Sequence, residues 1–326
     1  MRTLRVGLLG AGGIGARHAR ALAALSDRAE LVACCGRDPD RTAAFAAQHN
    51  AAPYTSFARM REDAALDLLI VALPPYAHTG QVEAAAEAGI HVLVEKPIAL
   101  DMERADSMVH VTQAAGIVAA CGFMYRFGEA VTAWDAMDKG RPGLFTGYFH
   151  CNDLHAPWWR QRALSGGQTV EQLIHIVDLA RHNFGMPRTV YARAANLFHR
   201  NIEGYDSEDV AAMMLGYDGG QVAVLTATNA AIPGRWDKGW TIVCESATGK
   251  FSDFNTGEIV RTRGDVQSTK IAGDRDVFVA QLENVLDAIE HRRAPKVPLS
   301  EGRDTLRIVL AVRQSSEEGR EVALGR

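Results

Sequence analysis

The chain has 326 residues, which is enough for two domains of ordinary size, each with its own core. Its 35 Lys and Arg residues nearly balance 39 Asp and Glu residues, and the formal net charge is −4 with neutral His. This balance provides no basic field for nucleic acid and no polybasic membrane patch, while 47% hydrophobic residues exclude a disordered or membrane-embedded chain. A compact protein that binds small molecules remains.

The five cysteines form no CxxC pair, and an odd number cannot be closed by intramolecular disulfides alone. We therefore expect buried, reduced thiols. The first residues, MRTLRVGLLGAGGIG, contain too short an apolar run for a signal peptide or a membrane span. Together these features predict a cytoplasmic protein.

The first 121 residues alternate apolar strands with Ala-rich helices. The expected strands are Leu4–Leu9, Leu31–Cys35, Leu66–Leu73, His91–Glu95 and Ile117–Cys121. The expected helices are Ile14–Leu25, Arg41–Gln48, Gln81–Ala88 and Met102–Ala115, the last with Asp101 as its N-cap. Strands that are apolar on both faces and separated by helices predict a doubly wound parallel sheet covered on both sides.

After about Gly122, long β-type runs follow one another without helices between them. The expected strands are Val190–Phe198, Asp209–Tyr217, Gln221–Asn229, Trp240–Glu245 and Glu258–Arg263. Short turns between consecutive strands predict a mostly antiparallel sheet, so an α/β half is joined to an α+β half. Helical periodicity returns at Val277–His291 and from Glu301 to about Glu318.

A GxGxxG motif, formed by Gly10, Gly12 and Gly15, lies between the first expected strand and the first expected helix. The first glycine permits a tight turn, the second lets the backbone approach a pyrophosphate, and the third lets helix and strand pack closely. The pyrophosphate would lie on backbone N–H groups at the helix N-terminus, which includes Gly13 and Ile14. The motif in this position predicts a dinucleotide cofactor.

The position that usually binds the adenosine ribose holds a glycine. Gly36 lies about twenty residues beyond the glycine motif, where a carboxylate would bind both ribose hydroxyls of NAD. A glycine removes repulsion against a 2′-phosphate, and Arg37 offers a planar fork of donors, so the pattern favours NADP. In the alternative, Arg37 is a solvated loop residue or stacks on adenine, Asp38 binds the ribose, and NAD is the cofactor.

Two further segments follow expected strands at the carboxyl edge of the parallel sheet, where ligands of open α/β folds lie. One is the turn LPPYAH, which ends at His78, and the other is Glu95-Lys96-Pro97. The residues expected at the cofactor are Gly10, Gly12, Gly13, Ile14, Gly15, Gly36, Arg37, Leu73, Pro74, His78, Glu95 and Lys96. Pro97 restricts the backbone of Lys96 and can form a cis peptide.

A third segment, GGQTVEQLIHIVD, runs from Gly166 to Asp178. On an α-helix, Glu171, His175 and Asp178 would be spaced i, i+4 and i+7 and would share one face. Carboxylate and imidazole groups also suit zinc or manganese, but no second cluster supplies closing ligands, so we expect no metal.

These segments together resemble one known family. The resemblance rests on Gly10–Gly15, on the turn with His78, on AGIHVLVEKPIAL from residue 88, on GFMYRF from residue 122 and on GGQTVEQLIHIVDL from residue 166. The chain resembles the glucose-fructose oxidoreductase, inositol dehydrogenase and MocA (Gfo/Idh/MocA) family over nearly its whole length. The resemblance implies a Rossmann-type domain, a C-terminal open-sheet domain, a nicotinamide cofactor, and oxidation or reduction of hydroxyl and carbonyl groups on sugars or cyclitols. It also implies a homodimer or homotetramer built through the open sheet.

The division expected on this basis has three parts. Residues 1–121 would bind the dinucleotide, and residues 122–300 would bind substrate and form the oligomer. Residues 301–326 would form a helix that, by the family pattern, packs back on the first domain.

The chemistry expected of the residues agrees with this family. Oxidation of a secondary alcohol needs a hydride acceptor and a base for the hydroxyl proton, and His175 is the natural candidate for that base. Lys96 can hydrogen-bond the reacting oxygen and stabilise its developing negative charge. Glu171 stands where many family members carry aspartate; it still reaches a substrate oxygen or the imidazole, but it weakens any transfer of substrate preference from inositol-type members. Asp178 either orients His175 or pairs with Arg181 on the surface.

Aromatic and polar residues near these segments are candidates for the substrate wall, because a sugar packs its C–H face on rings while its hydroxyls need partners. The candidate substrate residues are Tyr125, Arg126, Asn152, Trp158, Trp159, Arg160, Glu171 and His175. The two tryptophans are equally compatible with a core or a subunit interface. The leading prediction is an NAD(P)-dependent dehydrogenase or reductase; the alternatives are a non-catalytic nicotinamide sensor and a sugar-to-sugar oxidoreductase with tightly bound cofactor.

Overall fold

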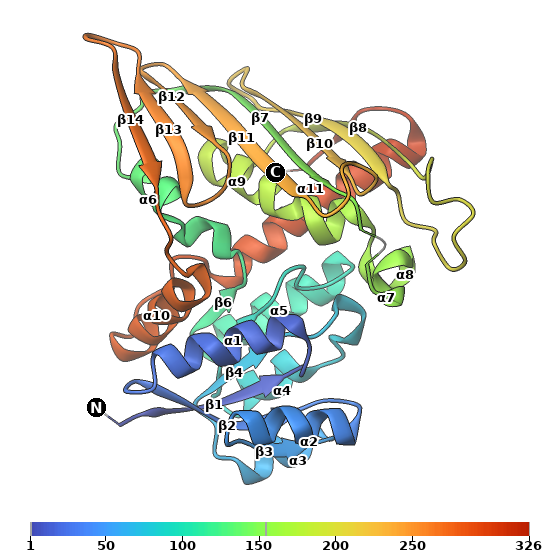
Figure 1. Cartoon of the computed structure of the whole chain (residues 1–326), viewed down its shortest axis with the longest axis vertical. Coiled ribbons are helices and arrows are strands. Elements are labelled where there is room, and N and C mark those ends of the chain that lie inside the picture. Colours follow the sequence, from blue (N-terminus) through green and yellow to red (C-terminus); the bar gives the residue numbers. More distant parts are fainter. Residues whose placement is uncertain (1, 154, 326) are drawn as a thin grey trace. The chain divides into compact units, whose positions relative to one another are not determined.

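The computed structural model describes residues 2–153 and 155–325 of the chain (Figure 1). The chain folds into two units. The first contains residues 1–124 and 276–303, and the second contains residues 125–275 and 304–326.

The first unit is built on a six-stranded sheet in the order β3-β2-β1-β4-β5-β6, and every paired strand in it is parallel. The strands are β1 (Leu4–Leu9), β2 (Ala29–Cys35), β3 (Ala52–Tyr54), β4 (Leu68–Val71), β5 (His91–Val94) and β6 (Ala119–Cys121). The helices between them are α1 (Gly13–Ala24), α2 (Pro39–Gln48), α3 (Phe57–Asp63), α4 (Gln81–Glu87) and α5 (Met102–Ala114). The expected doubly wound parallel sheet is confirmed, and β4 is buried along its whole length, as a central strand covered on both faces must be.

Side-chain caps fix where several of these helices begin. Asp101 accepts a hydrogen bond from the Arg104 amide at 2.8 Å and caps α5, as the sequence predicts. Asp38 caps α2 in the same way through the Arg41 amide, at 3.0 Å. The first unit also includes α10 (Val277–Glu290), which starts after its N-cap Asp276 and packs on α1 through Phe278.

The second unit is built on a nine-stranded sheet in the order β14-β13-β12-β11-β7-β10-β9-β8-β15. Its strands are β7 (Pro142–Cys151), β8 (Thr189–Ala195), β9 (Val210–Gly216), β10 (Val222–Thr228), β11 (Trp236–Cys244), β12 (Ala247–Phe251), β13 (Thr256–Arg261), β14 (Gln267–Ala272) and β15 (Val322–Ala323). Among the described residues of this sheet, only β7 and β10 pair in parallel, so the expected mostly antiparallel sheet is confirmed.

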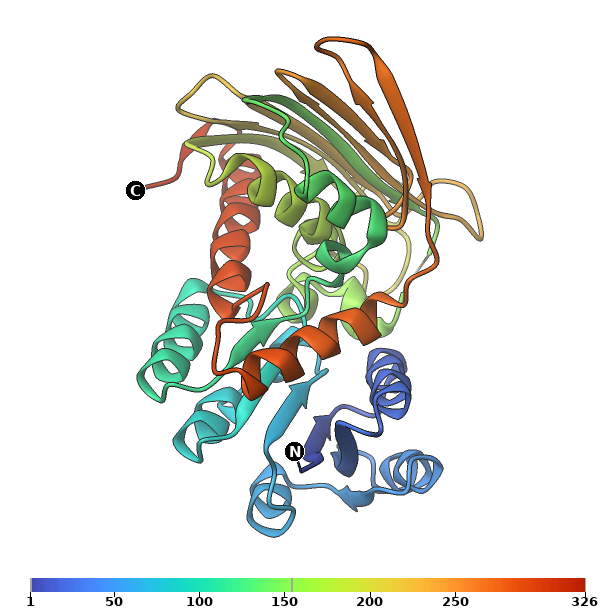
Figure 2. The same ribbon diagram turned by 90° about the vertical axis from the view of Figure 1, so that its left-hand side faces the viewer.

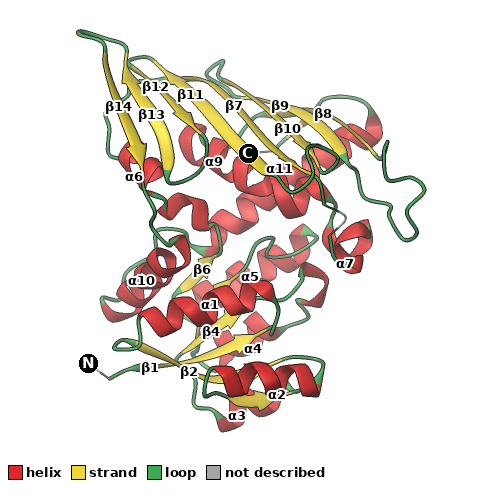
Figure 3. Ribbon diagram, in the orientation of Figure 1, coloured by secondary structure: helices red, strands yellow, loops and turns green. Residues whose placement is uncertain are grey.

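Helices cover one face of this sheet (Figures 2 and 3). They are α6 (Glu129–Asp135), α9 (Ile174–Phe184) and the later turns of α11 (Leu299–Glu318). The short helices α7 (Pro157–Arg160) and α8 (Arg162–Ser165) lie between β7 and α9 in the chain. Burial alternates along β7, β9 and β10, which places large apolar side chains such as Phe145 against the helices and leaves the opposite face open.

The division between units differs from the boundaries expected from the sequence. The segment that returns to the first unit is residues 276–303, whereas residues 304–326 belong to the second unit. The end of α11 is tied to the nine-stranded sheet, because Ser315 and Ser316 accept hydrogen bonds from the backbone amides of β8 residues Ala192 and Ala194. Strand β15 then pairs antiparallel with β8.

All five cysteines are buried and unpaired, as expected. Burial raises the pKa of the Cys34 and Cys151 thiols to about 11 in each case, so both stay protonated near neutral pH. In the part of the chain that the structure describes, no helix has both the length and the apolar character needed to cross a bilayer.

Candidate active site

The glycine motif forms the connection from β1 to α1. A side chain at Gly10 would collide with the carbonyl of Ala72, and one at Gly15 would collide with the carbonyl of Gly10, so both positions need glycine. A Cβ at Gly12 or Gly13 would meet nothing within 4 Å. Gly12 is the N-cap of α1 and supplies no side-chain cap, which leaves the first amides of the helix open to an anion. This cradle fits the pyrophosphate of a dinucleotide.

Asp38, which follows the end of β2, has a structural role. Its carboxylate caps α2, and its carbonyl accepts a hydrogen bond from the Thr42 hydroxyl at 2.6 Å. A Cβ at Gly36 would lie 2.5 Å from that hydroxyl oxygen, so position 36 has no room for the acidic side chain that usually binds the ribose. Arg37 is exposed on the loop beside it.

The turn after β4 is joined to the loop after β5 by His78. This side chain is buried, with Nδ1 2.6 Å from the Ile98 carbonyl oxygen and Nε2 3.2 Å from the Leu73 carbonyl oxygen. Burial lowers the pKa of the imidazole, which favours its neutral form. A neutral imidazole donates from only one ring nitrogen, and the shorter contact indicates a hydrogen bond from Nδ1 to the Ile98 carbonyl, which fixes the turn after β4 to the loop after β5.

The loop after β5 contains Glu95, Lys96 and Pro97, with a cis peptide between Lys96 and Pro97. Glu95 is buried and lies 2.8 Å from His18 of α1 through Oε1, while its Oε2 accepts the Lys96 amide at 3.2 Å. Lys96 is half-buried. It follows a strand two places from β1 in the sheet, at the carboxyl edge that also carries the glycine motif.

In the second unit, the segment that carries Glu171 is a π-helix, Thr169–Leu173, which leads directly into α9. Turns of this kind are rare and are frequent at functional sites. The wider turn means that Glu171 and His175 do not keep the regular α-helical spacing assumed from the sequence. Glu171 is half-buried, whereas His175 is only 5% exposed.

Glu208 anchors the start of this π-helix. Its carboxylate accepts the Thr169 amide at 2.9 Å and is itself buried. Gly167 has φ +93°, and a side chain there would collide with the Glu208 carboxylate. The glycine at position 167 is thus explained by the approach of Glu208, a residue that the sequence did not single out.

The His175 ring stacks on Tyr125, with centroids 4.5 Å apart and planes at 18°. Tyr125 is buried and also contacts Phe254 at 4.9 Å between centroids. Burial raises the pKa of the Tyr125 phenol, so it remains protonated. The stack fixes the plane of the imidazole.

Asp178 is bound by Arg126 rather than by Arg181. Arg126 donates from Nε to Oδ2 at 2.7 Å and from Nη2 to Oδ1 at 2.6 Å, and both side chains are almost fully buried. Thr305 donates to the same carboxylate at 3.2 Å and accepts a bond from Nε of Arg181 at 3.1 Å. Arg126, expected at the substrate, therefore forms a buried ion pair, and Asp178 lies in the interior rather than on the surface.

The aromatic segment before the glycine pair is folded on itself. Trp159 is buried and contacts the His155 ring in a tilted arrangement, with centroids 3.9 Å apart and planes at 35°, while Arg160 donates to the His155 carbonyl at 3.0 and 3.2 Å. Asn152 donates to the Ala231 carbonyl at 3.0 Å. Trp158 is half-buried and is the candidate of this segment that keeps the most accessible ring.

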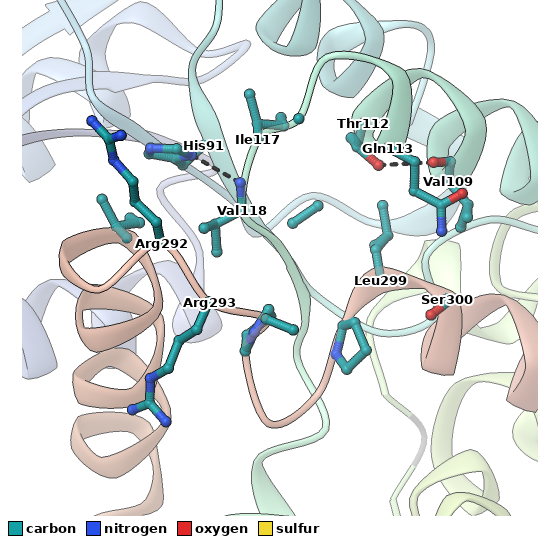
Figure 4. A pocket seen from close by; sticks show the side chains of 16 residues that line it. His91, Val109, Thr112, Gln113, Ile117, Val118, Arg292, Arg293, Leu299 and Ser300 are labelled. Carbon is teal, nitrogen blue, oxygen red and sulfur yellow. Dashed lines mark hydrogen bonds between the residues drawn. The ribbon is translucent and has the colours of Figure 1, made fainter.

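A cavity of about 680 Å³ lies in the first unit, and its lining includes neither the glycine motif nor Lys96 (Figure 4). It is lined by the start of β5, the end of α5 and residues 289–300. Inside it, His91 accepts the Val118 amide at 2.9 Å, and Arg292 and Arg293 extend in different directions. The cavity adjoins the amino end of β5, the wrong edge for the ligand of an open parallel sheet. Among the described residues, no cluster of three or more His, Cys, Asp or Glu could hold a metal ion.

Two family models match the chain. One, described as an oxidoreductase family with an NAD-binding Rossmann fold, covers residues 4–123, and the other, a GFO/IDH/MocA C-terminal domain, covers residues 129–249. Inositol 2-dehydrogenase of Rhizobium meliloti is 32% identical over 71% of each chain. UDP-N-acetylglucosamine 3-dehydrogenase of Acidithiobacillus ferrooxidans is 27% identical over 96% of this chain and 97% of its own. The solved structure of the WlbA dehydrogenase from Bordetella pertussis, in complex with NADH and UDP-GlcNAcA, covers all of both chains with 26% identity and a TM-score of 0.85.

Proposed function

The chain belongs to the Gfo/Idh/MocA oxidoreductase family, and from this premise we propose that it transfers a hydride between a nicotinamide dinucleotide and a secondary alcohol or ketone of a sugar, cyclitol or sugar derivative. One observation carries the proposal: the open helix N-terminus at Gly12 and Gly13 lies at the same edge of the sheet as Lys96. A phosphate cradle and a cationic side chain at one edge suit a dinucleotide and a reacting oxygen. The relatives named for inositol and UDP-N-acetylglucosamine support the substrate class.

The bound nicotinamide would supply the hydride acceptor or donor. The first amides of α1 would hold the pyrophosphate. The turn from Leu73 through Pro74, fixed by His78, and the loop at Glu95 and Lys96 would line the same edge of the sheet.

We propose that Lys96 stabilises the negative charge on the reacting oxygen. When a secondary alcohol loses hydride and proton, negative charge develops on its oxygen, and an ammonium group stabilises that charge. We propose that His175 takes up or returns the hydroxyl proton, because imidazole is the side chain best suited to general acid–base catalysis and the stack on Tyr125 fixes its plane. Glu171, half-buried on the π-helix, would accept a hydrogen bond from a substrate hydroxyl or from the imidazole.

The preference proposed for NADP rests on the end of β2. Asp38 is committed to the cap of α2, and Thr42 leaves no room for a carboxylate at position 36. Exposed Arg37 is then the group best suited to a 2′-phosphate, because its planar fork matches phosphate oxygens.

We also propose a homodimer or homotetramer formed through the open face of the nine-stranded sheet. Five large apolar side chains on that face are 37% to 45% exposed: Leu144, Tyr148, Met214, Val224 and Val243. Strand register places Val224 beside Met214 and Leu144 beside Val243, so four of the five lie in two short rows of neighbouring apolar side chains. A second copy of the chain would cover them. The buried, unpaired thiols support a cytoplasmic location.

The test is absorbance at 340 nm with NADP⁺ or NAD⁺ and a panel of myo-inositol, D-xylose, D-glucose and UDP-N-acetylglucosamine. We expect at least one member to reduce the cofactor. Cofactor binding without an absorbance change on any member would contradict the proposal and favour a sensor. Nicotinamide absorbance in the purified protein, before any cofactor is added, would instead indicate a sugar-to-sugar oxidoreductase.

A further inference from the structure

A buried hydrogen-bond partner for the loop after β5 comes from the middle of α1. His18 is fully buried on the same helix as the phosphate cradle, three residues beyond Gly15, and its Nε2 lies 2.8 Å from Oε1 of Glu95. The two residues are 77 positions apart in the chain. Neither the cofactor cradle nor the proposed hydride chemistry uses His18 directly.

The Glu95 carboxylate is enclosed on its other sides. Its Oε2 accepts the Lys96 amide at 3.2 Å, and a Cβ at Gly122 would lie 2.7 Å from that oxygen and 3.0 Å from the Cα of Glu95. A buried carboxylate is costly unless it is hydrogen-bonded or paired with a charge. Among the described residues, His18 and the Lys96 amide are the donors to this carboxylate, so they fix its rotamer.

The position of the His18 ring follows from its other neighbours. Phe278 of α10 meets it edge to face, with centroids 5.1 Å apart. Its Nδ1 has no hydrogen-bond partner among the described residues. An ionised carboxylate only accepts, so Nε2 must carry the proton and donate to Glu95. The ring therefore acts through this single bond.

We propose that His18 is a positioning residue for Lys96: it holds Glu95, and Glu95 holds the backbone of Lys96 at a fixed place relative to the helix that binds the pyrophosphate. The inference rests on the function proposed above for Lys96. The chain of contacts runs from α1 through His18 and Glu95 to the Lys96 amide, within the first unit throughout. Helix α1 would therefore fix the position of Lys96 as well as the position of the amides that would hold the pyrophosphate.

The first test compares three variants in the intact protein. His18→Leu removes the donor and should lower kcat about 10- to 100-fold, since small misplacements of a catalytic group have effects of that size, while KM and the Kd of NADP⁺ change less than about threefold. His18→Gln keeps an amide donor near the position of Nε2 and should restore most of kcat. Thr112→Val is the matched control, because the buried Thr112 hydroxyl bonds only to carbonyls of its own helix. It should leave kcat unchanged.

The substrate for these rates is whichever of myo-inositol, D-xylose, D-glucose and UDP-N-acetylglucosamine the wild type turns over fastest. A loss of NADP⁺ affinity as large as the loss of kcat, or no rescue by His18→Gln, would overturn the inference. If His18→Leu does not fold, His18→Met replaces it as a donor-free side chain of similar reach.

A double-mutant cycle separates this inference from the proposed function. If His18 acts through Lys96, His18→Leu should cause no further loss of kcat in a Lys96→Met background. If His18→Leu lowers kcat in the Lys96→Met background by as much as it does in the wild type, the positioning role is wrong. Unchanged kcat in Lys96→Met alone would instead overturn the function assigned to Lys96.

Hydrogen exchange at the Lys96 amide gives a readout that needs no turnover. His18→Leu should speed this exchange about tenfold or more, because the Glu95 carboxylate that accepts the amide is released, and His18→Gln should restore protection. Equal exchange rates in the wild type and His18→Leu would contradict the proposed chain of contacts, whatever the panel of sugars shows.

Discussion

At the scale of single residues, the sequence predicted positions that depend on the local chain and missed contacts that depend on a distant partner. Lys96 and the Asp101 cap follow from neighbouring residues, and the structure places them at a strand end and a helix start. Arg126 was expected at the substrate, yet it is bound by Asp178, 52 positions away. No spacing rule reports such a pair, because tertiary structure brings its members together.

Arg37 tests the cofactor preference. Arg37→Ala should raise KM for NADP⁺ about 10- to 100-fold, since two or more charge-assisted hydrogen bonds are lost, and should leave KM for NAD⁺ nearly unchanged. Asp38→Asn is the control, because asparagine caps a helix about as well as aspartate but has no charge for a ribose. A selective loss of NAD⁺ binding in Asp38→Asn, with NADP⁺ unaffected by Arg37→Ala, would reverse the assignment.

The buried Arg126–Asp178 pair is predicted to matter more for stability than any exposed pair. Asp178→Asn leaves the guanidinium in the interior without its charged partner and should lower the free energy of unfolding by about 3–5 kcal/mol. Glu317→Gln, which breaks the exposed pair of Glu317 with Arg162, should cost less than about 1 kcal/mol. Urea unfolding of both variants measures the contrast, and equal losses would be inconsistent with it.

At the scale of elements, the long apolar strands of the first unit were predictable and several strands of the second were not. Strand β7 reads PGLFTGYFHC, in which glycine and threonine interrupt the apolar run, yet it pairs with β10 and β11 near the centre of the sheet. Strands β3, β12 and β14 are short or polar. Their register comes from neighbouring strands, and the π-helix at Thr169–Leu173 likewise depends on Glu208.

The glycine pair before the π-helix provides a test at this scale. Gly167→Ala adds strain at φ +93° and pushes against Glu208, so it should lower both stability and kcat by displacing Glu171 and His175. Gly220→Ala is the control. Gly220 has a similar backbone angle, φ +83°, but a Cβ there would meet nothing within 4 Å. The substitution should cost about 1–2 kcal/mol of strain and leave kcat unchanged. Thermal unfolding and initial rates compare the two, and normal kcat in Gly167→Ala would exclude a role for the Glu208 anchor.

At the scale of the whole molecule, the expected pair of a parallel and a mostly antiparallel sheet matches the structure, while the expected path of the C-terminal segment does not. Residues 276–303 join the first unit because α10 packs its apolar face on α1. Residues 304–326 join the second because serine side chains and β15 bind β8. Helical periodicity identified both helices, but it contains no information on which sheet each would cover.

The open sheet face predicts the oligomer. Light scattering on the purified protein should give the mass of two or four chains, and Val224→Glu should shift it toward the monomer because a charge would enter an apolar interface. Val266→Glu is the control, since Val266 is 73% exposed in the turn between β13 and β14, outside the rows on that face. A monomeric wild type would contradict the proposal.

The proposed roles of Lys96 and His175 in hydride transfer are tested most directly by comparing kcat for NADP⁺ reduction in Lys96→Ala, His175→Ala and the wild type. The Kd of NADP⁺ is measured on each protein. We expect each variant to lose about two to four orders of magnitude in kcat, as is typical for electrostatic and proton-transfer groups, while the Kd changes less than about threefold. Near-normal kcat in both variants would contradict these roles.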